Sequence, residues 1–253
     1  MDSVISMVET YPNSPLVEAI CDINFADSTM WDPTTIGLFY EKINKDFPNK
    51  STMTRRECEG MSGEGCEALV VKKEYATFSS SDEKIKIIIG DKNLIVQSLK
   101  PYPSWKSFST SIIQALTALN SILKSTELSG IRLYYYNIIE DSTKELKIGD
   151  FFNLKPDTGT QLPKKIIDFI IGCEFPFESN NAICRTTLTT NLGDNPQEGE
   201  PANYTLGINY FAKNPEKIVS REIPKWIEIA HNDIIQIFEG IITDSLRKKF
   251  ERG

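Results

Sequence analysis

The sequence predicts an α+β fold made of two similar halves, and three patterns support this prediction. Within residues 15–25, one of the two possible strand faces is wholly apolar, which is typical of a strand packed on a core. Residues 104–124 and 224–250 instead repeat apolar side chains at helical spacing. Short strand-like segments, separated by turn residues, fill much of the chain between them. A chain that mixes helices and antiparallel strands in this way belongs to the α+β class.

The first half of the chain is predicted to contain a strand, a helix, four strands and a long helix. The strand covers residues 15–25, and the next helix begins at Asp32-Pro33, where an N-cap acid precedes a proline, and ends near residue 47. Antiparallel strands are expected near residues 52–59, 68–79, 84–90 and 93–99. The helix over residues 104–124 closes the half.

The same order restarts near residue 130. A strand is expected over residues 130–140, and a short helix is expected near residues 163–171. Further strands are expected near residues 182–191 and 204–212, with a weaker one near 217–221. A final helix is predicted from Pro224 to about residue 250, because proline is favoured at a helix start.

The shared order of elements indicates an internal duplication, with repeats over residues 1–126 and 127–253 that together form one compact unit. Trp105 and Trp226 lie near the start of each long helix, and each indole is expected to be buried against the sheet of its own half. This order is similar to that of the TATA-binding-protein saddle, in which two repeats join into one curved antiparallel sheet with helices on one side. The resemblance concerns topology, and a fold does not carry a function with it.

Composition and charge limit the classes of function. The 253 residues carry a formal net charge of −7, whereas proteins that depend on phosphate contacts are usually basic. Tight binding to nucleic acid is therefore not expected. Residues 1–11 lack the basic and apolar regions of a signal peptide, and no apolar run approaches the roughly 20 residues of a membrane span. With five cysteines in no close pairing, these features predict a cytoplasmic protein without contact to membranes.

Residues that catalysis and metal binding commonly use are scarce. His231 is the only histidine, and beside Glu228 and Asp233 on one helix it is expected to pack or cap locally. Cys58 and Cys66 are too widely spaced for a zinc site. We therefore expect no enzyme activity, no cofactor and no metal.

The run Tyr134-Tyr135-Tyr136 is the strongest sequence signal for a partner surface. In a strand these rings alternate between the two faces, so that Tyr134 and Tyr136 share a face available to a partner. The acidic loop over residues 194–201, with Glu198 and Glu200, is a second candidate for docking a partner. The alternative explanations are a central strand buried on both faces and a solvated loop tip.

A modest basic patch is expected if the strands of the first half pair with one another. It contains Arg55, Arg56, Lys72, Lys84 and Lys86, interleaved with aromatic residues as in proteins that bind single-stranded nucleic acid. The alternative explanation is that exposed lysines protect a sheet from aggregation at its edge.

Segments spread along nearly the whole chain carry a resemblance to a protein family. They are Pro15-Leu-Val-Glu18, Leu94-Ile-Val-Gln97, Trp105, Gly130-Ile-Arg-Leu-Tyr-Tyr-Tyr-Asn137 and, in the last helix, His231, Phe238 and Ile242-Thr-Asp244. They resemble a sporadically distributed family of uncharacterised prokaryotic proteins of about this length. The distribution of that family is similar to that of genes in defence and toxin–antitoxin modules. The sequence departs from the family pattern after Asn137, where a basic residue is expected.

These features lead to one main hypothesis and two alternatives. The main hypothesis is a non-enzymatic module that binds another, co-encoded protein as the regulatory or neutralising subunit of a prokaryotic defence or toxin–antitoxin system. A homodimer is a further arrangement of the same module. The first alternative is a saddle that binds nucleic acid through the concave face of its sheet. The second is a hydrolase or nuclease whose carboxylates come from distant segments.

Overall fold

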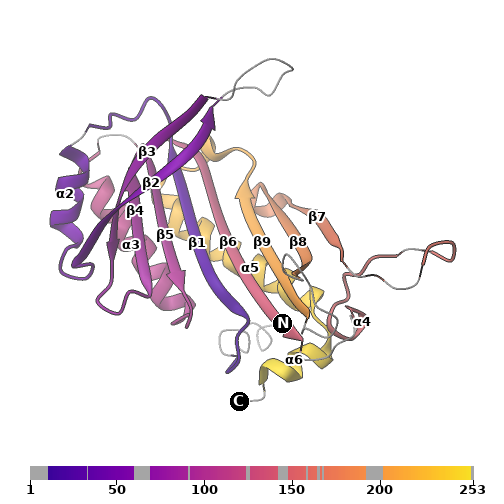
Figure 1. Cartoon of the computed structure of the whole chain (residues 1–253). Coiled ribbons are helices and arrows are strands. Elements are labelled where there is room, and N and C mark those ends of the chain that lie inside the picture. Colours follow the sequence, from indigo (N-terminus) through magenta and orange to yellow (C-terminus); the bar gives the residue numbers. More distant parts are fainter. Residues whose placement is uncertain are drawn as a thin grey trace.

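A computed structural model describes residues 11–32, 34–59, 69–90, 92–123, 126–141, 148–157, 159–163, 166, 168–191 and 202–251. This part of the chain forms one antiparallel sheet of nine strands with helices packed on it, which confirms the predicted α+β class (Figure 1). The strands are β1 (Leu16–Phe25), β2 (Asn49–Glu59), β3 (Leu69–Ser79), β4 (Ile85–Gly90), β5 (Asn93–Leu99), β6 (Leu128–Asp141), β7 (Ile170–Phe177), β8 (Ala182–Asn191) and β9 (Ala202–Ala212). They lie in the order β2-β3-β4-β5-β1-β6-β9-β8-β7.

β1 and β6 pair within the sheet and join the two halves of the chain. Their antiparallel pairing places Cys21 opposite Leu133 and Ile23 opposite Ile131. From this pair the strands follow outward in descending order, through β5 to β2 on one side and through β9 to β7 on the other. Residues 1–126 and 127–253 therefore contribute to one sheet, and their division into repeats stays a prediction.

Two long helices cover one face of the sheet. They are α3 (Trp105–Asn120) and α5 (Ile223–Ile241), and Figure 1 shows both behind the strands. The shorter helices are α2 (Thr34–Ile43), α4 (Ile148–Phe151) and α6 (Asp244–Glu251), with 3-10 turns η2 (Glu178–Asn180), η3 (Pro215–Lys217) and η4 (Ser220–Glu222). Among the described residues, no helix combines the length and apolarity needed to cross a bilayer.

The main hydrophobic core lies between the sheet and these helices. Cys21 and Ile23 of β1 are fully buried in it, because alternate side chains of a strand point to the same face. α3 contributes Phe108 and Ile112, which are four residues apart and therefore lie on one stripe of the helix. The alternation in β1 and the helical stripe are the features from which the sequence predicts this core.

β2 and β3 extend beyond the main sheet as a two-stranded ribbon. Only residues 76–79 of β3 pair with β4, whereas β2 and β3 pair along their whole length. Figure 1 shows the ribbon crossing in front of β4, on the side away from α3 and α5. Its Tyr75 packs with Ile88 of β4 and Ile95 of β5. A second, smaller apolar cluster therefore forms on the sheet face opposite the long helices.

The predicted short helix at residues 163–171 is wrong. None of its described residues is helical, and Ile170 begins β7, a strand at one end of the sheet. Burial in β7 alternates, with Ile171, Cys173 and Phe175 half-buried and their neighbours exposed. A strand covered on one face shows this period of two, which the mostly apolar segment at residues 166–171 conceals.

Two predictions near the C-terminus are also wrong. Residues 217–221 lie in and between the turns η3 and η4 rather than in a strand. The final helix is interrupted at Ile242, where extended backbone (φ −82°, ψ 149°) separates α5 from α6. Ile242 forms an isolated β-bridge with Phe152 there. Periodicity misses this break because Phe238 before it and Leu246 after it are both buried.

Candidate functional site

The sheet face opposite α3 and α5, called the open face below, carries the predicted partner residues Tyr134 and Tyr136. Tyr135 between them is only 4% exposed and belongs to the core under the helices. The pleat of β6 therefore directs its two neighbours to the open face. Both tyrosines are half-buried, and their ring centroids lie 6.4 Å apart. The structure brings the two rings together on one surface.

Tyr134 lies over Gly207 of the neighbouring strand β9. A Cβ atom at position 207 would stand 2.8 Å from the hydroxyl oxygen of Tyr134, closer than non-bonded atoms normally approach. The missing side chain of Gly207 therefore lets the Tyr134 ring lie against the sheet. Burial raises the pKa of Tyr134, and the nearby Tyr136 and Glu18 add to the effect. The hydroxyl consequently stays protonated at neutral pH.

A buried carboxylate, that of Asp22, anchors the polar part of the open face. Nη2 of Arg132 in β6 lies 2.7 Å from its Oδ2, and Nδ2 of Asn93 in β5 donates to its Oδ1 at 2.7 Å. Asn24 donates to the same Oδ1 at 3.3 Å. Because these donors already occupy both oxygens, Asp22 holds β1, β5 and β6 together. The Arg132 side chain remains 48% exposed and available to a partner.

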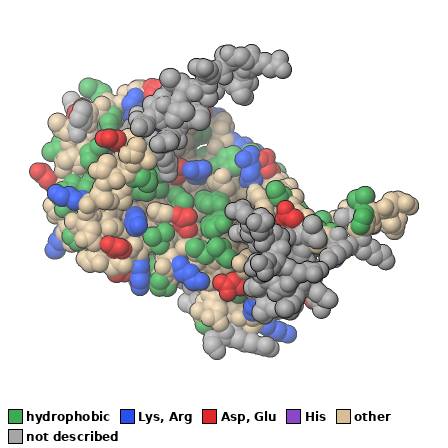
Figure 2. Space-filling model, viewed as in Figure 1, with side chains coloured by type: hydrophobic (Ala, Val, Ile, Leu, Met, Phe, Trp, Pro, Cys, Tyr) green, Lys and Arg blue, Asp and Glu red, His purple; other side chains and the backbone are tan. Residues whose placement is uncertain are grey.

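A second arginine extends the open face across β8 and β9. The guanidinium carbon of Arg185 lies 5.6 Å from the ring centroid of Phe211, which is a cation–π contact. Arg185 also pairs with Glu174 of β7 at 2.5 Å. Figure 2 shows hydrophobic side chains in the middle of this face, with acidic and basic side chains close to them. Arg132 and Arg185 thus each have a carboxylate partner, so their charges are locally balanced.

Part of the predicted basic patch lies outside the described residues. β2 pairs with β3, so that Arg55 stands opposite Lys73 and Arg56 opposite Lys72 in the backbone register. The side chains of Arg55, Arg56 and Lys72 are outside the described part of the structure. The strands are therefore adjacent, as the patch requires, and the patch itself stays a prediction.

The remaining predicted site residues lie in two other places. Lys86 is half-exposed in β4, and Lys84, just before that strand, has its Nζ 3.9 Å from a carboxylate oxygen of Asp82. Glu198 and Glu200 lie outside the described residues. Their role in docking a partner stays a prediction.

On the helix side of the sheet, His231 connects α5 to both α3 and β6. Its ring stacks on the Trp105 indole, with 4.0 Å between centroids and 6° between planes. Its Nδ1 forms a 2.7 Å hydrogen bond with the hydroxyl of Tyr135, and Trp105 donates from Nε1 to Glu228 at 2.8 Å. Burial lowers the pKa of His231 to about 4, so that the ring is neutral at pH 7. The geometry gives His231 a packing role that spans three elements.

The two tryptophans differ in their surroundings. Trp226 is 4% exposed and contacts Tyr210 of β9, with 5.6 Å between ring centroids, as expected for burial within its own half. Trp105 is equally buried at 5%, but its main aromatic contact is His231 of the other half. Its packing against the sheet of its own half therefore stays a prediction, and the stack on His231 shows in addition that α3 and α5 meet behind the sheet.

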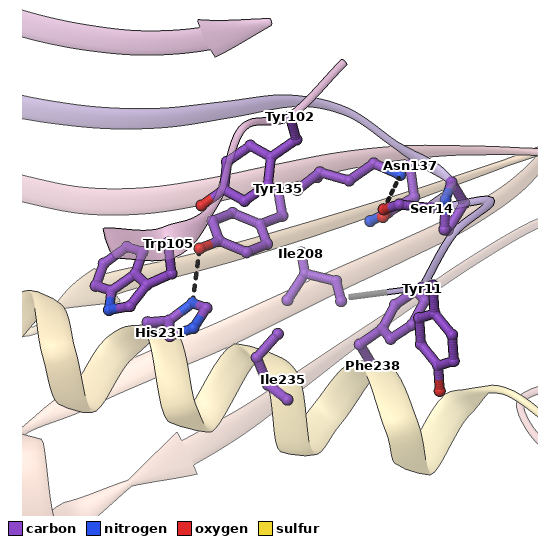
Figure 3. Close-up of a pocket in the computed structure, with 12 residues that line it drawn as sticks. Tyr11, Ser14, Tyr102, Trp105, Tyr135, Asn137, Ile208, His231, Ile235 and Phe238 are labelled. Carbon is purple, nitrogen blue, oxygen red and sulfur yellow. Dashed lines mark hydrogen bonds between the residues drawn. The ribbon is translucent and has the colours of Figure 1, made fainter. Parts of the chain in front are cut away.

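A cavity of about 100 Å³ adjoins the His231 cluster, between the sheet and α5 (Figure 3). Ile208 projects toward it from the sheet and Ile235 from α5, with His231 at one end and Tyr11 at the other. Asn137 of β6 also lines it. No Asp, Glu, Lys or Arg side chain is found among its described lining residues. The cavity is therefore an uncharged chamber on the face of the sheet opposite the two partner tyrosines.

Sequence reasoning missed the Asp22–Arg132 pair, Gly207 and the cavity. The available signal was the alternation in the first strand and in residues 130–140, which places Asp22 and Arg132 on the polar side of their strands. Their contact joins residues 110 positions apart in the chain, so it requires the register between β1 and β6. A single sequence does not supply that register.

Comparison with known proteins identifies no family. The chain matches no protein-family model and no curated protein sequence. Among the described residues, no group of three or more His, Cys, Asp or Glu side chains is close enough to hold a metal ion. The resemblance to a sporadically distributed prokaryotic family therefore stays a prediction.

Proposed function

We propose that this protein binds a protein partner through the open face, with Tyr134 and Tyr136 at the centre of the contact. The observation that carries the proposal is the position of these rings, half-buried side by side on the face opposite α3 and α5. Arg132 lies two residues before Tyr134 in β6. Across the sheet, Tyr134 is opposite Asn209 of β9, which is in turn opposite Arg185 of β8. Tyrosine and arginine are the residue types that most often carry the energy of an interface.

Charge favours a protein over a polyanion as the partner. The chain has a formal net charge of −7, which repels phosphates at long range. Arg132 and Arg185 already pair with Asp22 and Glu174, so phosphates would compete with these carboxylates. A protein partner that offers apolar and hydrogen-bonding groups can bind without displacing these carboxylates from the arginines. The expected partner surface is therefore apolar at its centre and polar at its rim.

The saddle-like arrangement of two repeats belongs to the same proposal. Outward from β1 the strands are β5, β4, β3 and β2, and outward from β6 they are β9, β8 and β7, so both halves run in descending order. In the chain, α3 comes after β5 and α5 comes after β9, and these two strands flank the central pair. This order supports a duplication with a topology similar to that of the TATA-binding protein. Superposition of the two halves in an experimental structure tests it, and halves without a common core of strands and long helix would contradict it.

The family resemblance extends the proposal to a biological setting. If the chain belongs to that sporadic prokaryotic family, its partner is encoded by a neighbouring gene, and the protein regulates or neutralises it in the cytoplasm. A module of the defence or toxin–antitoxin type fits this arrangement. Expression of the neighbouring gene alone should then slow growth, and co-expression of this protein should relieve the effect.

Binding of single-stranded nucleic acid is the second candidate function. The observation that favours it is the gathering of Tyr134, Tyr136 and Phe211 with two arginines on one sheet face, since bases stack on such aromatic rings. The basic residues of β2, β3 and β4 would extend that surface if their side chains reach it. Strong dependence of binding on salt would distinguish this function from protein binding.

Capture of the partner from the native host tests the proposed function. Tagged wild-type protein is compared with Tyr134→Ala and Tyr136→Ala, and with Ile113→Ala as a matched control on the exposed side of α3. The proposal expects a co-purifying protein that both tyrosine variants lose and the control retains. Retention of that protein by both tyrosine variants would exclude the open face as its binding site. A second copy of this chain as the captured protein would identify a homodimer.

A further inference from the structure

The cavity beside His231 has the shape and chemistry of a small-molecule site that is separate from the open face. Its apolar wall comes from Ile208 of β9 and from Ile235 and Phe238 of α5. Trp105 supplies a flat aromatic surface at one end. A dry cavity of about 150 Å³ with apolar walls binds benzene, so at about 100 Å³ this chamber holds only part of a ring-sized ligand. The rest of such a ligand would extend into the adjoining depression of about 460 Å³.

Two buried polar side chains in the lining have hydrogen-bonding capacity to spare. Asn137 is 4% exposed and His231 6% exposed. Asn137 donates from Nδ2 to the carbonyl of Leu206, and His231 uses Nδ1 with Tyr135. The Oδ1 atom of Asn137 and the second ring nitrogen of His231 have no hydrogen-bond partner among the described residues. Neither atom is sealed from solvent, so each can hydrogen-bond to water or to a molecule bound in the cavity.

The charge of the chamber restricts what can enter it. The lining holds no carboxylate, lysine or arginine among the described residues, and burial keeps His231 neutral. An ionised ligand would lose its hydration without gaining a counter-charge, which is strongly unfavourable. The chamber therefore selects uncharged molecules.

A second pocket adjoins the chamber at the surface. A larger depression of about 460 Å³ at the surface shares Tyr11, Ser14, Pro15, Leu16 and Tyr102 with the chamber lining. Lys100 and Lys249 stand in the outer depression and not in the chamber. The chamber and the surface depression therefore adjoin each other near Tyr11.

We propose that this chamber binds a small uncharged molecule with a flat apolar body and one polar group that both donates and accepts hydrogen bonds, such as a carboxamide. The apolar body packs between Ile208 and Ile235. The polar group exchanges a hydrogen bond with the free ring nitrogen of His231, at the end of the chamber that Trp105 also lines. The chamber lies on the helix side of the sheet, so this proposal can be tested independently of partner binding at the open face.

Nuclear magnetic resonance of the single histidine gives a direct readout. Protein labelled with ¹⁵N in the imidazole shows the two ring nitrogens of His231 alone, because the chain contains one histidine. The probes are benzamide and benzoate, which have the same shape and differ in charge. Benzamide is expected to shift the resonance of the free ring nitrogen with saturation in the millimolar range, the affinity expected of so small a ligand. Benzoate is expected to leave it unchanged.

Variants locate the binding. Ile235→Phe and, independently, Ile208→Phe fill the chamber and should abolish the benzamide shift, whereas Ile113→Ala should keep it. Circular dichroism identifies a variant that fails to fold. In that case, the loss of the benzamide shift is judged from the other variant. No shift with benzamide up to its solubility would overturn the proposal and leave a chamber that holds only water. Equal binding of benzoate, or a benzamide shift that survives in both folded chamber variants, would also overturn it.

Discussion

The imidazole of His231 lies parallel to the indole of Trp105, with 4.0 Å between ring centroids and 6° between planes. The two residues belong to α5 and α3, which come from opposite halves of the chain. The same imidazole is hydrogen-bonded to Tyr135 of β6. One side chain therefore connects both long helices to the centre of the sheet, and its protonation affects the packing of all three.

Stability should fall as the pH decreases from about 6.5 to about 4. Burial lowers the pKa of His231 to about 4, from 6.5 in an exposed chain. Between these pH values the imidazole is protonated in the unfolded chain and neutral in the folded protein, so the free energy of unfolding decreases as the pH falls. The full effect is about 3 kcal/mol, reached below the folded pKa. Neighbouring Tyr135 stays neutral, because burial raises its pKa well above the usual value.

Urea denaturation at pH 7 and pH 4.5 measures this effect. Carboxylates also titrate near the lower pH, so the comparison is made with His231→Gln, which removes only the imidazole. The loss of unfolding free energy should be smaller in the variant than in the wild type. An equal loss in both proteins would show that His231 is not the titrating group.

Replacing either buried tryptophan by alanine should destabilise the protein by about 3–5 kcal/mol, the usual cost of removing a large buried aromatic. The two variants should differ in one respect. Trp105→Ala removes the ring that covers His231 and should therefore raise the histidine pKa toward its usual value, whereas Trp226→Ala should not. Thermal unfolding measures the first effect and a histidine NMR titration the second. A histidine pKa unaffected by Trp105→Ala would contradict the stacking.

Gly207→Ala should weaken partner binding while changing stability little. The new Cβ would stand 2.8 Å from the Tyr134 hydroxyl, which must move, and the flexible end of a side chain can do so. The control is Gly172→Ala in β7, where the new Cβ would stand 3.9 Å from the Thr186 carbonyl oxygen, an ordinary van der Waals contact. Partner affinity should fall about tenfold, or about 1.4 kcal/mol, for Gly207→Ala alone. If the two variants bind the partner with equal affinity, Tyr134 is not part of the contact.

Generic nucleic acid should bind only weakly. With a net charge of −7, fluorescence anisotropy with duplex DNA and single-stranded RNA should give no dissociation constant below about 1 µM at physiological salt. Submicromolar binding that weakens steeply with added salt would favour the nucleic-acid alternative. Arg132→Ala and Arg185→Ala would then identify the surface, because each removes one exposed cation from the open face.

The sequence is informative where a single strand or helix determines its own pattern. The apolar side of residues 15–25 and the helical stripe after Trp105 predict β1 and α3, and the alternation at residues 134–136 predicts which tyrosines share a face. The helical reading of residues 163–171 fails because a short apolar run has no distinct period until a sheet covers one side of it.

Features that depend on register or on the meeting of separate elements were beyond the sequence. The Asp22–Arg132 pair needs β1 and β6 aligned, and the fit of Tyr134 on Gly207 needs β6 aligned with β9. The contact between Trp105 and His231 requires α3 and α5 to meet behind the sheet. No local pattern in the chain encodes these alignments, which tertiary packing decides.

The affinity of the captured partner for Tyr134→Ala, measured by titration calorimetry, tests the central claim most directly. Ile113→Ala serves as the control, and circular dichroism verifies the fold of both variants. If the open face is the binding surface, Tyr134→Ala should raise the dissociation constant about thirtyfold, the effect of a hot-spot residue worth about 2 kcal/mol, and the control should leave it unchanged. An unchanged dissociation constant for Tyr134→Ala, and likewise for Tyr136→Ala, would contradict the account and place the binding surface elsewhere.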